Sequence, residues 1–167
     1  TGARNILIAY NVNLDTEDKS AANRIAGKIR SSGVFKKNED GEKIFDGDGV
    51  PVRIPGRFQA LQAAGWMYNE DTAQVSMNLL DYSLTGLHHV TEAIREESAK
   101  IGLNVTASEL VGLVPLNALV DAGRYYNDDP NADLKDLVHS AVSGLQLDVL
   151  DEFIPEQRII EWAAEAE

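Results

Sequence analysis

Three short polar side chains on one predicted strand have the chemistry of a binding surface. In residues 73–81 apolar and polar residues alternate, which predicts a β-strand with two different faces. The polar positions are Gln74, Ser76 and Asn78. Amide and hydroxyl groups donate and accept hydrogen bonds without carrying charge, so this face suits a polar ligand or a facing domain.

Similar polar residues occur on two further predicted strands. Residues 5–14 alternate in the same way, and Asn11 and Asn13 lie opposite the large apolar side chains. Glu109 interrupts an apolar stretch near the end of a strand predicted over residues 103–111. A carboxylate beside so much apolar surface requires a partner, which is either a structural arginine or a ligand.

The histidines and the acidic turns do not have the spacing of a metal site. His88 and His89 are neighbours on a predicted helix, so they point about 100° apart and do not easily share a metal ion. We interpret them as histidines of a helix surface or an interface. Asp46 and Asp48 suggest a calcium loop, but the other ligand positions of an EF-hand are missing, which favours an acidic turn. We therefore expect no metal site.

The order of the predicted elements indicates an α+β fold. The elements are a strand over residues 5–14, a helix from Thr16 to Gly33, strands over 58–68 and 72–82, a helix over 84–101 and a strand over 103–111. The order βαββαβ is ferredoxin-like, with a four-stranded antiparallel sheet and two helices on one face. The polar residues would then lie on the other, uncovered face.

Two segments add to this unit, and we expect a single domain over residues 1–167. Residues 34–57 are hydrophilic and rich in turn signals, which predicts a hairpin-like insertion. Residues 115–167 form a C-terminal helical extension, with helices predicted over 115–126, 133–144 and 155–160.

The composition excludes several classes of protein. The 167 residues contain no cysteine, which excludes disulfides, thiolate metal sites and a cysteine nucleophile. The net charge of −12 makes nucleic acid an unsuitable partner, and no apolar run is long enough for a membrane span. We expect a cytoplasmic protein. An anionic ligand would need positive charge from a local group or from outside this chain.

Several motifs along the chain resemble one enzyme family. The matching segments are Gly2-Ala3-Arg4-Asn5, Leu7-Ile8-Ala9, Asn11-Val12-Asn13-Leu14, Gly65-Trp66, the run from Ala73 to Leu79, Leu87-His88, the run from Ser108 to Leu116, Leu145-x-Leu147-Asp148 and Phe153-x-Pro155-x-x-Arg158-Ile159-Ile160-Glu161. They occur in the right order over almost the whole chain. Together they resemble the formiminotransferase domain of folate-dependent glutamate formimidoyltransferase, and only its carboxy-terminal subdomain.

The resemblance implies a folate site shared between two subdomains. In this family two ferredoxin-like subdomains enclose the folate in a tunnel, and the catalytic histidine belongs to the amino-terminal one. We therefore assign no catalytic residue here, not even His88, which matches a family position. Tetrahydrofolate would be the co-substrate, with N-formimino-L-glutamate and the amino-terminal subdomain as further partners. The expected folate-binding and substrate-binding residues are Arg4, Asn11, Asn13, Gln74, Ser76, Asn78 and Glu109.

The resemblance also implies a transferase of one-carbon metabolism and histidine degradation. A chain that begins with Thr1 favours a piece of a longer enzyme, with little activity of its own. One alternative is a non-enzymatic ferredoxin-like module that binds a protein, or dimerises, through its open sheet face. Another is a glutamate formyltransferase of the same family. The residues leave open a homodimer, a fused cyclodeaminase domain and the role of residues 34–57.

Overall fold

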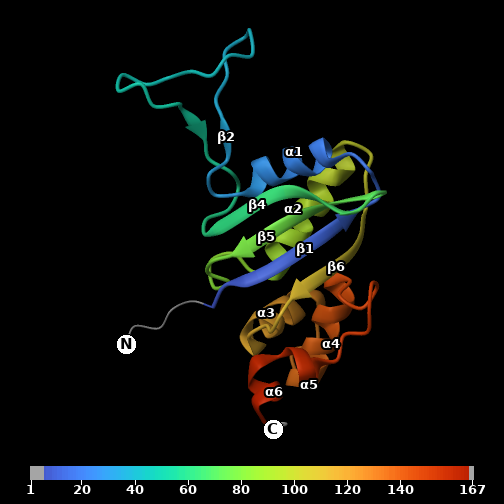
Figure 1. Ribbon diagram of the computed structural model, residues 1–167. Helices are drawn as coiled ribbons and strands as arrows, with labels where there is room; N and C mark the ends of the chain where they lie inside the picture. The colour runs from blue at the N-terminus through green and yellow to red at the C-terminus, as the bar shows by residue number, and fades with distance from the viewer. Residues whose placement is uncertain (1–5, 166–167) are drawn as a thin grey trace.

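A four-stranded antiparallel sheet forms the centre of the molecule (Figure 1). The computed structural model describes residues 6–165. The strands are β1 (Ile8–Leu14), β4 (Leu61–Asn69), β5 (Thr72–Leu79) and β6 (Val105–Val111). Their order across the sheet is β4-β5-β1-β6, and every neighbouring pair is antiparallel. With one helix after β1 and another after β5, this order is ferredoxin-like and confirms the predicted fold.

Two helices, α1 (Lys19–Ile29) and α2 (Leu87–Lys100), pack on one face of this sheet and lie behind the strands in Figure 1. The predicted start of α1 at Thr16 is wrong. The helix is capped by Asp18, whose carboxylate accepts from the backbone N–H of Ser20 at 3.0 Å. The Thr16 hydroxyl instead accepts from the N–H of Asp18, in the turn before the helix.

The core lies between the sheet and these two helices. Alternate residues of the strands and the apolar stripe of each helix are buried there: Ile8, Tyr10, Val12, Leu14, Val75, Met77, Leu79, Ala22, Ile25, Ala26, Ile29, Leu87, Val90, Ala93 and Ile94. Gly65 of β4 lets α1 approach the sheet closely, because a Cβ atom there would lie 2.5 Å from the backbone nitrogen of Asn23.

Four further helices lie beyond β6: α3 (Leu116–Tyr126), α4 (Leu134–Leu145), α5 (Pro155–Arg158) and α6 (Ile160–Glu165). The single helix predicted over residues 155–160 is instead two. The helix is interrupted at Ile159, which forms a parallel bridge with Val114. The N–H of Ile160 donates to the Val114 carbonyl at 2.9 Å. No helix within residues 6–165 is long and apolar enough to cross a membrane.

Residues 34–57 form an arm that projects from the body of the molecule (Figure 1). Its base is the short pair β2 (Val34–Phe35) and β3 (Arg53–Ile54). Further out, the Asp46 carboxylate accepts from two backbone N–H groups, of Asp48 at 2.9 Å and Val50 at 3.0 Å. Asp46 therefore closes a turn, in agreement with the predicted acidic turn.

Both edges of the sheet are occupied by hydrogen bonds from the chain itself. At β4, Ser31 exchanges bonds with the backbone of Leu61, through its N–H at 2.9 Å and its hydroxyl at 2.8 Å. At β6, the Gln146 carbonyl accepts from the N–H of Ser108 at 3.0 Å, and Arg158 donates to the Leu110 carbonyl. These bonds occupy backbone groups of Leu61, Ser108 and Leu110 with which an additional strand would otherwise pair.

Candidate functional site

The predicted binding residues lie together on the face of the sheet opposite α1 and α2, which we call the open face. The strand register sets its side chains in three rows: Trp66–Gln74–Asn13–Ala107, Ala64–Ser76–Asn11–Glu109 and Gln62–Asn78–Ala9–Val111. Directly opposed residues of neighbouring strands share a face, so these are true lateral neighbours. Six of the seven predicted residues are in these rows. The seventh, Arg4, lies outside the described residues.

Hydrogen bonds between side chains tie the open face together across the strands. Asn11 Nδ2 donates to Glu109 Oε1 at 3.0 Å, joining β1 to β6. Gln74 Nε2 donates to Asn13 Oδ1 at 2.9 Å, joining β5 to β1. Asn78 Nδ2 donates to Gln62 Oε1 at 3.2 Å, joining β5 to β4. Each bond uses one polar atom of each partner and holds the side chains of this face in place.

Burial divides the predicted residues into two kinds. Asn13 and Gln74 are only 2% and 4% exposed, so their mutual hydrogen bond satisfies buried amides and is chiefly structural. Asn11, Ser76, Asn78 and Glu109 are half-buried and reach the surface. The sequence did not separate these two kinds, because alternation along a strand assigns a face but not a depth. The half-buried four are the better candidates for ligand contact.

The partner of Glu109 within the chain is the amide of Asn11, not an arginine. Arg158 lies at the same edge of the sheet, but its guanidinium donates to the carbonyls of Leu110 and Gly112. Among residues 6–165, no lysine or arginine nitrogen comes within 4.0 Å of the Glu109 carboxylate, so the structural-arginine alternative is not supported there. Glu109 is half-buried on the open face, so part of its side chain is exposed.

Two residues of β4 join the site that the sequence did not single out for ligand contact. Gln62 Oε1 accepts from Asn78 Nδ2 at 3.2 Å, and Trp66 is 59% exposed beside Gln74. The ammonium of Lys19 lies 5.6 Å from the centre of the Trp66 ring. Gln62, Ala64 and Trp66 occupy alternate positions of β4, so the sequence placed them on one face of the strand. Only the pairing of β4 with β5 showed that this face is the open face.

His88 lies away from this site, on α2 and therefore on the other side of the sheet. Its ring centre lies 5.1 Å from that of Tyr125 and 4.1 Å from that of His89, closer than a 100° separation suggested. Burial, with a smaller contribution from the charge of His89, lowers the pKa of His88 to about 4. Its Nδ1 atom is buried and has no hydrogen-bond partner among the described residues.

No group of three or more potential ligands is arranged to hold a metal ion within residues 6–165. The candidate chemistry of the open face is therefore hydrogen bonding by amides, one hydroxyl and one carboxylate. Such a surface suits a flat molecule with alternating donors and acceptors along its edge.

The fold is that of a ferredoxin-like domain, and the comparison with known families shows to which family it belongs. The family model of the formiminotransferase domain matches residues 9–165. Since this match covers most of the chain, the chain belongs to the formiminotransferase domain family.

Several curated proteins are similar to the chain. It is 41% identical to the formimidoyltransferase-cyclodeaminase of Rattus norvegicus over 166 residues, which cover 97% of the chain and 28% of that protein. The same protein of Dictyostelium discoideum is 39% identical over 166 residues, with the same shares. The glutamate formimidoyltransferase of Streptococcus pyogenes serotype M1 is 36% identical over 126 residues, which cover 75% of the chain and 35% of that protein.

The chain spans about a third or less of the length of these relatives. Most of each relative therefore has no counterpart in these 167 residues. This is the relation expected for one subdomain of a larger enzyme, as the motif resemblance indicated.

Proposed function

We propose that the open face forms one wall of a folate site in a glutamate formimidoyltransferase. The reaction moves the formimino group between N-formimino-L-glutamate and tetrahydrofolate, and yields glutamate and 5-formimidoyltetrahydrofolate. One observation carries the proposal: Asn11, Ser76, Asn78 and Glu109 are half-buried polar residues on a sheet face that no described helix covers. Membership of the formiminotransferase family favours this function over a dimerisation module or a formyltransferase.

In this proposal the chain binds and orients the folate, while the partner subdomain supplies the proton transfer. A pterin ring carries adjacent N–H donors, and a carboxylate accepts hydrogen bonds from both. The carboxylate of Glu109, held by the amide of Asn11, would fill this role. The amides of Asn78 and Gln62 would hydrogen-bond other edge atoms of the ring. A base near the N5 amine of the folate, needed for the transfer, comes from the amino-terminal subdomain.

The proposal also accounts for the acidic charge of the chain. Folate and formiminoglutamate are anionic, whereas the net charge here is −12 and the three rows of the open face contain no lysine or arginine. The amino-terminal subdomain, together with Arg4, would supply the positive charge. We further propose that the enzyme is cytoplasmic and acts in histidine degradation. In its single domain, residues 34–57 would be an inserted arm and residues 115–167 a helical extension. We also propose that the enzyme forms a homodimer.

Fluorescence provides a direct test of the binding surface. In a Trp162→Phe background Trp66 is the remaining indole, and it lies on the open face. Titration with 5-formyltetrahydrofolate, in the presence of an amino-terminal formiminotransferase subdomain, should change this fluorescence in a saturable manner. Asn78→Ala should weaken binding roughly fivefold or more, because a polar contact to the ligand is lost. The matched control Asn117→Ala changes the same residue type on the exposed surface of α3 and should have no effect.

A transfer assay tests the division of labour. Formimino transfer should appear when the chain and the amino-terminal subdomain are mixed, and should be absent from the chain by itself. Activity of the isolated chain would overturn the assignment of catalysis to the other subdomain. Equal folate affinity in the Asn78→Ala and Asn117→Ala variants would overturn the role of the open face.

A further inference from the structure

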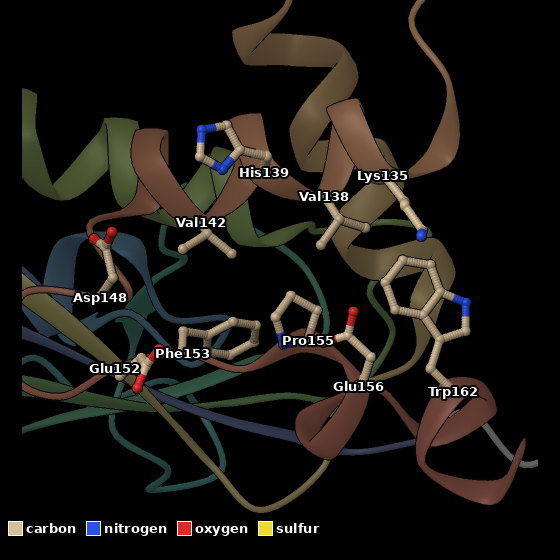
Figure 2. Close-up of a pocket in the computed structure, with 10 residues that line it drawn as sticks. All are labelled: Lys135, Val138, His139, Val142, Asp148, Glu152, Phe153, Pro155, Glu156 and Trp162. Atoms are coloured by element: carbon tan, nitrogen blue, oxygen red, sulfur yellow. The ribbon is translucent and has the colours of Figure 1, made fainter. Parts of the chain in front are cut away.

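A second candidate site lies among the C-terminal helices, on elements that do not contribute to the open face. A pocket of about 350 Å³ lies between α4, the segment that follows it, and the two last helices (Figure 2). Ligand pockets in proteins occupy roughly 300–1,000 Å³, so this pocket has the size for a small organic molecule.

The inner surface of this pocket is apolar and partly aromatic. Val138 and Val142 extend from α4 towards the ring of Phe153, and Pro155 lies beside that ring (Figure 2). The indole of Trp162, on α6, closes one end. Val138, Val142 and Phe153 are buried, so the floor of the pocket is fixed by the packing of the core.

The rim of the pocket carries an excess of negative charge. Three carboxylates line it, those of Asp148, Glu152 and Glu156, against the single ammonium of Lys135 and the imidazole of His139. Within residues 6–165 none of the three carboxylates has a lysine, arginine or histidine nitrogen within 4.0 Å. The carboxylates are therefore available to an external cation.

We propose that this pocket binds an organic ammonium ion with an aromatic or branched apolar body. The apolar body would lie on Phe153 and beside Trp162, while the ammonium group would lie at the opposite end of the pocket, near Asp148 and Glu152 (Figure 2). Cations are attracted both to carboxylates and to the faces of aromatic rings, so the two parts of the lining favour the same kind of ligand. The net charge of −12 raises the local concentration of any cation near the molecule.

The charge of Lys135 predicts the direction in which the affinity for a cation changes when that charge is removed. Its ammonium lines the same pocket and repels a bound cation, whereas it would attract an anion. Removal of its charge should therefore strengthen the binding of an ammonium ion, and removal of a carboxylate should weaken it. A pocket for an anion would respond in the opposite way to both changes.

The binding experiment uses phenethylammonium chloride as the probe and Trp162 as the reporter. The chain has two tryptophans, so Trp66→Phe leaves Trp162 as the remaining indole. We expect a saturable fluorescence change that weakens as the salt concentration rises, because salt screens the carboxylates. The uncharged analogue 2-phenylethanol should bind roughly tenfold more weakly, since it retains the apolar body but lacks the charge.

Variants of the lining then identify the groups that bind the cation. Asp148→Asn and Glu152→Gln should each weaken phenethylammonium binding roughly two- to fivefold, as expected for one exposed ion pair, and Glu156→Gln, at the other end of the pocket, should weaken it less. Lys135→Gln should strengthen it by a smaller factor, because Lys135 lies at the Trp162 end of the pocket (Figure 2). Asp121→Asn is the matched control, because it removes an exposed carboxylate from α3, which does not line the pocket.

Three outcomes would overturn the inference. The first is equal affinity for phenethylammonium and 2-phenylethanol, which would show an apolar pocket without selection for charge. The second is weaker binding in Lys135→Gln. The third is the absence of saturable phenethylammonium binding; dimerisation in sedimentation experiments that Trp162→Ala abolishes would then assign the pocket to a second copy of the chain. Folate binding, followed through Trp66, is not involved in any of these outcomes.

Discussion

The two faces of the central sheet consist of the same four strands and have opposite chemistry. On the face covered by α1 and α2, side chains such as Val12, Met77 and Leu79 are fully buried against the helices. On the open face, the neighbouring positions hold amides, a hydroxyl and a carboxylate. Because alternate residues of a strand point to opposite sides, one run of sequence encodes both surfaces.

Polar groups are satisfied differently on the two faces. On the covered face the Tyr10 hydroxyl is fully buried and bonds to the hydroxyls of Thr91 at 2.7 Å and Ser108 at 3.1 Å. Burial raises the pKa of Tyr10, so the group stays neutral. On the open face Asn13 and Gln74 are also buried and bond to each other, whereas the bonds of Asn11 with Glu109 and of Asn78 with Gln62 join side chains that reach the surface. The buried bonds stabilise the fold, and the half-buried ones leave polar side chains at the surface of the open face.

The largest effect on stability should come from the covered face. Leu79→Ala removes a fully buried side chain between the sheet and the helices. We expect the free energy of unfolding to fall by about 3 kcal/mol, from lost burial and the cavity left behind. Urea denaturation followed by circular dichroism measures this loss, and the folded variant should bind folate with unchanged affinity. A loss below 1 kcal/mol would show that the covered face is not the main source of stability.

A smaller loss is expected where the open face is buried. Gln74→Ala leaves the nearly inaccessible amide of Asn13 without its partner. The cost should be about 1–2 kcal/mol of unfolding free energy, the penalty for an unsatisfied buried polar group. The same denaturation experiment measures it. Ser76→Ala on the same strand is the control, because Ser76 is half-buried and makes no side-chain hydrogen bond within residues 6–165.

The helix layer over the covered face should make stability depend on pH. His88 has a folded-state pKa of about 4, against 6.5 for the unperturbed imidazole, since burial and His89 disfavour its charge, while Glu92 acts the other way. At a pH between these two pKa values, the unfolded chain binds a proton at His88 that the folded chain does not bind. The free energy of unfolding therefore falls as the pH is lowered from about 6.5 to 4.

Because His88 is only half-buried, solvent screening reduces this contribution to about 1 kcal/mol. Urea denaturation at pH 7 and pH 4.5 should show the loss in the original chain and a smaller one in His88→Phe, whose ring retains the stacking on Tyr125. Identical profiles for the original chain and His88→Phe would contradict the prediction.

The smallest effect on stability should come from the half-buried part of the open face. Glu109→Gln keeps the shape of the side chain and an oxygen for Asn11, so the free energy of unfolding should change by less than about 0.5 kcal/mol. Folate affinity should nevertheless fall, since the charge that accepts the N–H groups of the pterin is lost. Denaturation and folate titration on the same sample separate the two effects. A large loss of stability without a change in affinity would reverse the roles of the two faces.

Much of the fold could be predicted because its signals are local. The alternation in residues 73–81 and the apolar stripe of α1 depend on neighbours in the chain, and the positions of β5 and α1 followed from them. Element ends were less accurate, as at Thr16, because a nearby carboxylate competed for the cap. The break at Ile159 was missed because its cause, the pairing with Val114, lies 45 residues away in the sequence.

The sequence by itself determined which residues are polar, which of them share a face, and the order of the elements, because these properties follow from side-chain chemistry and strand periodicity. Only the tertiary structure decided how the residues meet. Pairing of β1 with both β5 and β6 set Asn11 beside Glu109 and buried Asn13 with Gln74. The positions of α4, the segment after it, α5 and α6 formed the pocket at Trp162. These contacts join segments far apart in the chain, where no local pattern specifies register or depth.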